Sequence, residues 1–412
     1  MKMFENGVCR LRESEGKTFS VVFAGDACAK TPEAVDQMLN HSRELAAGVK
    51  PFFDSADLRI LQWECALTDT DFPIDKSGPN LKAPAGCAEN FGKALGIDVM
   101  LLANNHIGDY GPDAVIDTIE NVKKSGFVSA GAGKNLAEAS QTVFVECKGI
   151  RIALINFAEN EFGTASAGKP GVAPMDPFKN IAQIRAARKE ADFVMVAIHG
   201  GHEFYSYPSP RMVELYREYA AAGADLVWNC HTHCPAGCEN YNGVPVVYSP
   251  GNFYFPYRTD MIKGWNTGYL TKFYCDEKGV YAYELLPCKF DACTLSPLDE
   301  ADRKLFFEHI EKLSAEIQDP ERIQALFEAW CTKSGMLYLS SISNRPEEET
   351  WPPDWSVRER VAGWLHIRNV FTCESHTALL RQTLRLIEEY RVEEAAKLLP
   401  EVLELQTPAW MK

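Results

Sequence analysis

The sequence has no excess of basic residues and no long apolar run. Its 42 Lys and Arg residues stand against 57 Asp and Glu residues, which gives a formal net charge of −15. A surface this acidic repels phosphate backbones, which argues against a nucleic-acid partner. No apolar run approaches the ~20 residues that span a bilayer, and the first residues lack the apolar centre of a secretory signal. We therefore expect a cytoplasmic protein with no membrane segment.

Cysteines are frequent, but their spacing lacks the pattern of a disulfide framework, a zinc site or a redox pair. The thirteen cysteines are odd in number and scattered along 412 residues, which is typical of reduced thiols. Cys230, Cys234 and Cys238 recur every four residues, whereas zinc and redox motifs use Cys-x-x-Cys pairs. We interpret these three as small packing residues and keep a metal contact from Cys230 or Cys234 as the alternative.

The first two thirds of the chain alternate short apolar runs with amphipathic patterns. This alternation predicts a mixed α/β fold, in which strands without an intervening helix pair antiparallel. The predicted strands cover 18–26, 58–64, 98–106, 151–159, 192–200, 224–231, 244–249, 268–276 and 279–290. The predicted helices between them cover 32–48, 111–126 and 209–223.

The composition changes near Ser296, after which Glu, Leu, Ala and Lys recur at helical spacing. Because 412 residues exceed the usual size of one domain, we expect an α/β domain over 1–290 and a helical region over 291–412. A loop or linker is predicted over 343–355. The predicted helices of this region cover 300–317, 320–330, 375–391 and 392–405.

Polar side chains follow several of the predicted strands at the point where each strand ends. In open α/β sheets this edge is where ligands bind. The chain has only nine histidines, and four of them lie at these strand ends or in the loop just after. The residues placed there are Asp26, Glu64, Asn105, His106, His199, His231 and His233.

The chemical types of these side chains favour a metal site. Carboxylates, imidazoles and one amide form a mixed oxygen and nitrogen shell, which suits Mn²⁺, Fe or Zn²⁺. Two such ions bridged by a carboxylate would bind a phosphate group. His231 and His233 can face one site because residues i and i+2 of a strand point to the same side. The alternative is a pair of incidental polar residues. Metal binding should weaken below about pH 6, where imidazoles are protonated.

Six segments occur in order between about Phe19 and Phe255: AGD, ANNHIGDYG, GAGKNLAEA, HGGHEFYSYPSP, GADLVWNCHTH and YNGVPVVYSPGNFYF. Their order and spacing resemble those of the CapA family, which is named for capsular poly-γ-glutamate synthesis. That family belongs to the calcineurin-like metallophosphoesterase superfamily. The resemblance implies an αββα sandwich of two mixed β-sheets flanked by helices, with two divalent metal ions at the sheet edges.

The resemblance also implies a role for each matching residue. His106 resembles the histidine that stabilises the transferred phosphoryl group and protonates the leaving oxygen. Glu203 matches a glutamate that orients a metal ligand or the substrate. Glu64 looks like the carboxylate that bridges two ions. The full set of implied metal ligands is Asp26, Glu64, Asn105, His199, His231 and His233.

Two polar residues beside His106 have two interpretations each. Asn104 either lines the substrate pocket or satisfies backbone groups of its own loop. Asp109 either holds the His106 ring, as catalytic histidines need, or caps the helix that follows Gly111. We take Asp109 and His106 as catalytic candidates and Asn104 and Glu203 as substrate-binding candidates.

Three motifs depart from the patterns of these proteins. Gln62 and Trp63 precede Glu64, where the family has Asn and Leu. Cys28 stands where the superfamily has the histidine of Asp-x-His, and is either a thiolate ligand or a small buried residue. Cys230 stands before the paired histidines, where Gly is more usual. These changes bear on whether the first of the two implied metal positions is occupied.

Together these observations predict a metal-dependent hydrolase of phosphomonoesters or phosphodiesters that activates water between two divalent ions. The first alternative is a non-hydrolytic component of a poly-γ-glutamate or capsular polymer synthesis assembly. The second is a hydrolase of a γ-glutamyl or peptide-like polymer. The expected partner is a small anionic substrate or an anionic polymer, and a homo-oligomer is left open.

Overall fold

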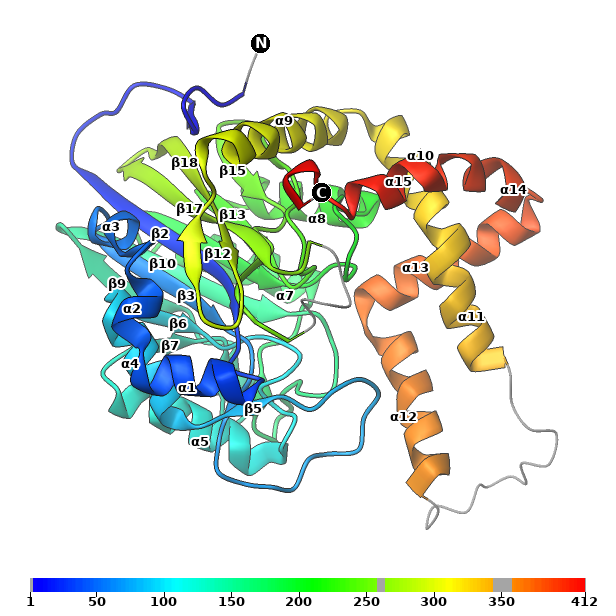
Figure 1. The fold of residues 1–412 in the computed structure, drawn as a ribbon, viewed down its shortest axis with the longest axis horizontal. Helices are drawn as coiled ribbons and strands as arrows, with labels where there is room; N and C mark the ends of the chain where they lie inside the picture. The colour runs from blue at the N-terminus through cyan, green and yellow to red at the C-terminus, as the bar shows by residue number, and fades with distance from the viewer. Residues whose placement is uncertain (1–2, 258–263, 344–357, 412) are drawn as a thin grey trace.

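The computed structural model describes residues 3–257, 264–343 and 358–411. Two mixed β-sheets pack face to face between layers of helices, and further helices lie over one side of this sandwich (Figure 1). The predicted αββα class is confirmed. Among the described residues, no helix has the length and apolar character needed to cross a bilayer.

The first sheet has nine strands. They are β1 (Val8–Arg10), β2 (Thr18–Ala27), β3 (Leu58–Trp63), β6 (Val99–Leu101), β7 (Val128–Ala130), β16 (Asn252–Tyr254), β17 (Thr267–Asp276), β18 (Gly279–Phe290) and β19 (Leu295–Pro297). Their order is β1-β18-β17-β2-β3-β6-β7, with β16 beside β2 and β19 beside β18. β2, β3, β6 and β7 pair in parallel, so their carboxyl ends meet at one edge.

The second sheet has six strands in the order β14-β15-β13-β12-β10-β9. They are β9 (Val143–Cys147), β10 (Ile150–Ala158), β12 (Phe193–His199), β13 (Leu226–Cys230), β14 (Cys238–Tyr241) and β15 (Val244–Val247). The four central strands are parallel, and β9 and β14 pair antiparallel at the edges. Two small pairs, β4 (Ala66–Leu67) with β5 (Lys82–Ala83) and β8 (Ala132–Gly133) with β11 (Gly171–Val172), lie outside both sheets.

Aromatic side chains join the inner faces of the two sheets. Phe23 of β2 lies 5.1 Å from Trp228 of β13 between ring centroids, and Phe19 meets Phe193 of β12 edge to face at 5.2 Å. All four rings are buried. Burial of such rings supplies the largest apolar areas in a core, so these contacts fix how the two sheets are stacked.

Helices cover the outer faces of both sheets. Those over the first sheet are α1 (Pro32–Asn40), α2 (Ser42–Ala46), α3 (Lys50–Asp54), α4 (Ala85–Leu95) and α5 (Gly111–Lys124). Those over the second are α7 (Pro177–Ala187) and α8 (Pro210–Ala221), and the short α6 (Leu136–Ala139) packs on β8. The helix predicted over 32–48 is wrong in one respect, because it is interrupted at His41, whose backbone leaves helical geometry.

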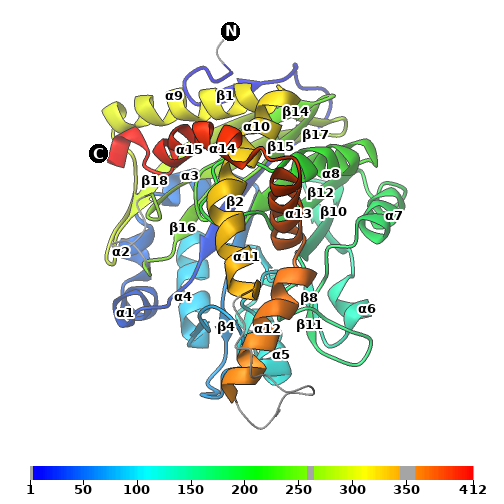
Figure 2. The same ribbon diagram turned by 90° about the vertical axis from the view of Figure 1, so that its right-hand side faces the viewer.

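The last part of the chain is helical, and Figure 2 shows α11, α12 and α13 lying in front of the sandwich. The elements are α9 (Glu300–Ile317), α10 (Pro320–Trp330), the π-helical η1 (Cys331–Gly335), α11 (Met336–Ser343), α12 (Arg358–Thr372), α13 (Glu374–Glu388), α14 (Val392–Ala395), η2 (Ala396–Leu398), α15 (Leu399–Leu405) and η3 (Ala409–Met411). β19 extends the first sheet past residue 290, and a domain boundary there stays a prediction.

One of the helices predicted in this region is interrupted in the structure. The helix predicted over 392–405 is divided into α14, η2 and α15, because Pro400 lies in the first turn of α15 and cannot continue a preceding helix. The loop predicted over 343–355 lies almost entirely outside the described residues. The helices predicted over 300–317 and 320–330 are confirmed with the same bounds.

Candidate metal centre

The carboxyl ends of strands from both sheets bring polar side chains to one place. Asp26 lies near the end of β2, Glu64 directly follows β3, and His199 is the last residue of β12. His231 directly follows β13. Because the inner strands of each sheet are parallel, side chains far apart in the sequence meet at the same end of the sandwich.

Ligand atoms at this end form two groups that share Glu64. Glu64, His199 and His231 offer atoms that lie within 4.8 Å of one another, and so do Asp26, Glu64 and His233. Asn105 joins the first group, since its Oδ1 oxygen lies 3.1 Å from the Nε2 nitrogen of His199. The structure thus brings all six predicted ligands together, and their role as ligands stays a prediction.

The oxygens of this cluster fit a bound cation. Both carboxylate oxygens of Glu64 and the Oδ1 oxygen of Asp26 are buried without a hydrogen-bond donor among the described residues. Buried polar atoms almost always have a partner, so orphaned anionic oxygens at one place indicate a positive charge that belongs there. The residues present therefore suit divalent metal binding, and the donor set of carboxylates and imidazoles is one that such ions accept.

Burial also shifts the pKa values of these groups, and a bound cation would offset its effect on the two carboxylates. Burial raises the pKa of Asp26 to about 6, although the charge and backbone N–H of His231 act in the opposite direction. Burial, followed by the charges of Asp26 and Glu203, raises the pKa of Glu64 well above its usual range. Burial lowers the pKa of His199, which keeps its imidazole neutral and able to bind metal.

The loop that carries His231 and His233 has an unusual backbone. Both residues have positive φ angles, 104° and 57°, in a region that side chains other than glycine rarely enter. The backbone N–H of His231 donates to Asp26 Oδ2 at 3.1 Å. The predicted ligand Asp26 therefore holds the loop that carries the predicted ligand His231. Such strain persists only where surrounding contacts fix it, and it is common at functional sites.

Asn252, at the start of β16, holds the ring of His233. Its Oδ1 oxygen lies 2.9 Å from the His233 Nδ1 nitrogen, and its Nδ2 group donates to the backbone oxygen of Trp265. This arrangement leaves the Nε2 nitrogen of His233 3.7 Å from Glu64 Oε1. Sequence reasoning did not identify Asn252, although it lies within one of the six ordered segments.

His106 is held by a buried ionic network. Its Nδ1 nitrogen lies 2.6 Å from Asp109 Oδ2, and the Nζ nitrogen of Lys76 donates to Asp109 Oδ1 at 2.5 Å. Burial opposes ionisation of Asp109, but the His106 and Lys76 charges prevail and lower its pKa. Burial, opposed by Asp109 and assisted by Lys76, lowers the pKa of His106. Asp109 therefore contacts the ring, and Tyr110, not Asp109, is the residue that precedes α5.

The two predicted substrate-binding residues differ in placement. Asn104 is fully buried; its side chain accepts from the N–H groups of His106 and Ile107 and donates to the backbone of Trp63 and Leu102. These contacts favour its loop-shaping interpretation. Glu203 is exposed to two cavities that adjoin the metal ligands.

The departures from the family pattern lie close to the centre. Gln62 is buried and donates weakly to the backbone of Ala103 at 3.4 Å. Cys28 is buried beside Cys65, and it is in none of the ligand groups of the described residues. The position of Cys28 favours its interpretation as a small packing residue. Cys230 does approach the centre, with its sulfur 3.3 Å from His199 Nδ1 and within a third group with Asp26.

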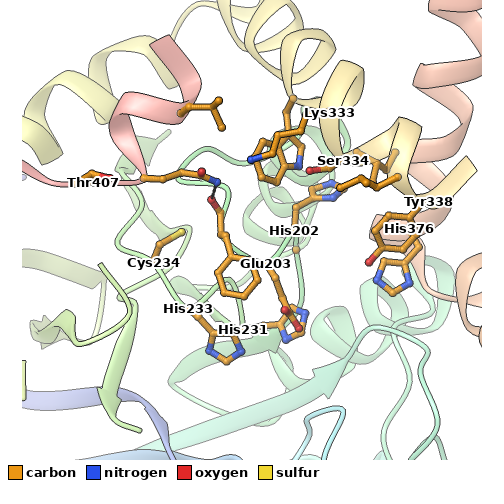
Figure 3. Close-up of a pocket in the computed structure, with 17 residues that line it drawn as sticks. His202, Glu203, His231, His233, Cys234, Lys333, Ser334, Tyr338, His376 and Thr407 are labelled. Carbon is orange, nitrogen blue, oxygen red and sulfur yellow. Dashed lines mark hydrogen bonds between the residues drawn. The ribbon is translucent and has the colours of Figure 1, made fainter. Parts of the chain in front are cut away.

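Two cavities adjoin the metal ligands. The larger, of about 490 Å³, is floored by His231, His233 and Glu203 and roofed by Lys333 and other residues of the C-terminal helices (Figure 3). The smaller, of about 230 Å³, is lined by residues that include His106, Lys76 and Asn105. Glu203 and His233 line both cavities, so the ligand cluster lies where they meet.

A buried carboxylate connects the metal-ligand end of β10 to the C-terminal helices. Glu159 follows β10 and forms an ion pair with Arg211 of α8. It also accepts from the N–H and hydroxyl groups of Ser375 at 3.2 and 2.9 Å, at the start of α13. Sequence reasoning missed Glu159, although it ends an apolar strand in the same way that Glu64 does.

Comparison with known proteins gives a family and several relatives. The family model described as "Bacterial capsule synthesis protein PGA_cap" matches residues 20–257. The chain is 31% identical to the PGA biosynthesis protein CapA of Bacillus subtilis, over 52% of this chain and 56% of that protein. It is 30% identical to the capsule biosynthesis protein CapA of Bacillus anthracis, over 51% and 52%. The match thus spans about half the length of these curated relatives.

Among solved structures, a 5'-nucleotidase precursor from Thermus thermophilus aligns with a TM-score of 0.42 and 16% identity. The alignment covers 68% of this chain and 55% of that one. At this score, strand order and pairing within the chain itself are the better description of the fold.

Proposed function

This chain belongs to the PGA_cap family of bacterial capsule synthesis proteins, and we propose that it is a metal-dependent hydrolase of small phosphoesters. The observation that supports this proposal is the pair of ligand groups that share Glu64, whose two oxygens are buried with no donor in the part of the chain that the structure describes. A shared carboxylate between two groups of imidazole and carboxylate ligands is the arrangement that two neighbouring divalent ions need.

The proposed ligand sets follow from the distances between side chains. His199, His231 and Asn105 would hold one ion, Asp26 and His233 would hold the other, and Glu64 is placed to contribute to both. When bound, divalent ions supply Lewis-acid polarisation of a phosphoryl group and a hydrolytic water of lowered pKa. Mn²⁺, Fe and Zn²⁺ all accept this donor set.

His106 handles the proton of the leaving group in this proposal. Because Asp109 binds Nδ1, the Nε2 nitrogen of the His106 ring is left for the substrate. Lys76 fixes Asp109 from the other side, so the ring cannot turn without breaking its buried contact with Asp109. The lowered pKa of His106 favours a neutral ring before binding, and a bound phosphate group would raise that pKa and let Nε2 carry a proton. Proton donation from such a fixed imidazolium to a departing oxygen contributes about 10²–10⁴-fold in rate in other enzymes.

The dimensions of the cavities support a small substrate. The larger cavity, of about 490 Å³, falls within the range of small-ligand pockets, and the smaller one, of about 230 Å³, lies below that range. The net charge of −15 disfavours polyanionic nucleic acid. We therefore place phosphomonoesters and small phosphodiesters first among the substrates.

Metal analysis followed by two assays tests this proposal. We expect protein purified without added metal to contain divalent ions by elemental analysis, and to hydrolyse p-nitrophenyl phosphate or its bis ester with Mn²⁺. Asp26→Ala and His231→Ala should lose both the metal and the turnover. Lys304→Met, on the exposed face of α9, serves as the control that should retain both. Absence of metal and of turnover in the unmodified protein would contradict the proposal.

The position of Cys28 favours a second candidate function. With Cys28 outside the ligand groups, one of the two proposed ions has only three protein ligands, Asp26, Glu64 and His233. A weakly held ion is compatible with a non-hydrolytic component of a polymer synthesis assembly, and a mycobacterial relative is named a probable polyglutamine synthesis accessory protein. A γ-glutamyl polymer would then be the partner. One tightly bound ion per chain with no turnover would favour this candidate.

A further inference from the structure

The roof of the larger cavity comes from a part of the chain that lies outside the family match. The matched residues end at 257, whereas Lys333, Tyr338 and His376 line the cavity from η1, α11 and α13. Figure 3 shows these side chains across the cavity from His231 and His233. The metal-ligand end of the cavity thus lies within the matched segment, and its far end is built by residues that follow that segment.

The roof is held in place by specific contacts. At the start of α13, the backbone N–H and the hydroxyl group of Ser375 both donate to Glu159, beside the metal-ligand strands. Asn369 of α12 donates to Glu161 Oε2 at 3.1 Å. Gly335 of η1 lies so close to Thr383 of α13 that a side chain would not fit between them. The roof therefore has a fixed position over the cavity.

Lys333 lies on η1, the π-helical turn of the roof. An interruption of this kind changes the direction of side chains relative to a continuous α-helix, and π-helical turns are frequent at functional sites. Among the described residues, no carboxylate lies within ion-pair distance of the Lys333 ammonium group, whose nitrogen lies 5.8 Å from the centroid of the Trp330 ring. An unpaired cation in a cavity wall is available to a ligand.

The walls of the larger cavity between its metal-ligand end and Lys333 are mainly apolar. Trp330, Leu337, Leu379 and Leu403 supply apolar surface, and Glu203, at the metal-ligand end, is the only carboxylate among the described lining residues. A phosphoryl group at the metal-ligand end would be held by the divalent ions, whereas any second anionic group on a ligand is repelled by Glu203 and attracted by Lys333.

We propose that the larger cavity binds the leaving group of the substrate, and that this group has an apolar body with a second acidic group directed at Lys333. The inference rests on the proposed function, because it takes the phosphoryl group to lie at the metal ligands. The substrate class is thus a small phosphoester with acidic groups at both ends. Lys333 is a specificity residue in this proposal and takes no part in bond breaking.

Binding of two phosphonates tests the inference without requiring turnover. The probes are benzylphosphonate and 4-carboxybenzylphosphonate, titrated calorimetrically into the Mn²⁺-supplemented full chain. We expect the carboxylated compound to bind at least about tenfold more tightly, as one charge-assisted contact allows. Lys333→Met should remove this preference, and Lys333→Arg should keep it. Lys333→Glu should instead prefer 4-aminomethylbenzylphosphonate.

The control is Lys304→Met, which removes an exposed lysine of α9 and should leave the preference unchanged. Equal affinity of the two phosphonates for the unmodified protein would overturn the inference, as would a preference that survives in Lys333→Met. Failure of both compounds to bind would also overturn it. Turnover of p-nitrophenyl phosphate decides the proposed function separately, since that substrate has no second acidic group.

Discussion

The Nδ1 nitrogen of His233 lies 2.9 Å from the Oδ1 oxygen of Asn252. This contact orients the ring so that Nε2 faces Glu64, and outer partners of this kind set the affinity of a histidine for metal. We expect Asn252→Ala to weaken binding of the ion held by His233 by about 10–100-fold. Competition with a chromophoric chelator measures the change, and Asn252→Asp, which keeps the acceptor oxygen, should retain most of the affinity. Unchanged affinity in Asn252→Ala would show that the ring needs no such support.

The strand-end pattern explains how much of this site could be predicted. Asp26, Glu64 and His199 end apolar strands, and parallel strands carry such residues to one edge. The same rule applied to "RIALINFAE" would have found Glu159. It could not find Lys76, which lies between β4 and β5 without a periodic pattern and meets Asp109 only after folding.

The helical roof shows a different limit of prediction. Helical spacing predicted α9 and α10 with the same bounds, because an amphipathic pattern is a local property of the sequence. Where these helices lie is not local. The contact of Glu159 with Ser375 joins residues more than two hundred positions apart, and no periodicity in either segment indicates it.

Cys28 offers a direct test of the metal ligands. Its side chain is buried beside Cys65, so we expect Cys28→Ala to leave the metal content unchanged. Cobalt substitution gives a second measurement, because a thiolate ligand adds a charge-transfer band in the near ultraviolet. That spectrum should be the same in Cys28→Ala as in the unmodified protein. Cys230→Ala is the comparison, since the Cys230 sulfur does lie beside His199. Metal lost on replacing Cys28 would make it a ligand.

Lys76 and Asp109 form a buried ion pair, with side chains that are 3% and 0% exposed. Removing one partner leaves the other charge buried, so Lys76→Met should lower the free energy of unfolding by about 3–5 kcal/mol. Urea unfolding measures the loss. Lys82→Met, at the start of β5, is the matched control, because its partner Asp71 is 88% exposed and such pairs contribute under about 1 kcal/mol. Equal losses in the two variants would contradict a buried pair.

Glu159 should make stability depend on pH in acid. Burial opposes its ionisation, but the Arg211 charge and the Ser375 hydroxyl lower its pKa from 4.5 to about 2. A depressed carboxyl pKa stabilises the folded protein above pH 4.5, and this contribution is lost as the pH falls towards 2. Its size is roughly 3 kcal/mol at neutral pH, by the usual linkage. Urea unfolding of metal-free protein between pH 7 and 3 should show a flatter profile for Glu159→Gln. Glu190→Gln, which changes an exposed residue, should keep the steeper profile of the unmodified protein.

Gly335 determines how closely η1 approaches α13. A methyl group at this position would collide with the side chain of Thr383, which is buried and bonds back to Leu379 within its own helix. Gly335→Ala should therefore lower the free energy of unfolding by about 1–3 kcal/mol, the usual effect of overpacking. Because Thr383→Ala removes the closest colliding atoms, the double variant with Gly335→Ala and Thr383→Ala should recover part of the loss.

The control is Gly363→Ala, at an open position of α12, which should be neutral or slightly stabilising because alanine favours helix. Since η1 also carries Lys333, a shift of this turn should weaken phosphonate binding together with stability, and the double variant should recover part of both. Stability lost without any change in binding would separate the packing of the roof from the shape of the cavity.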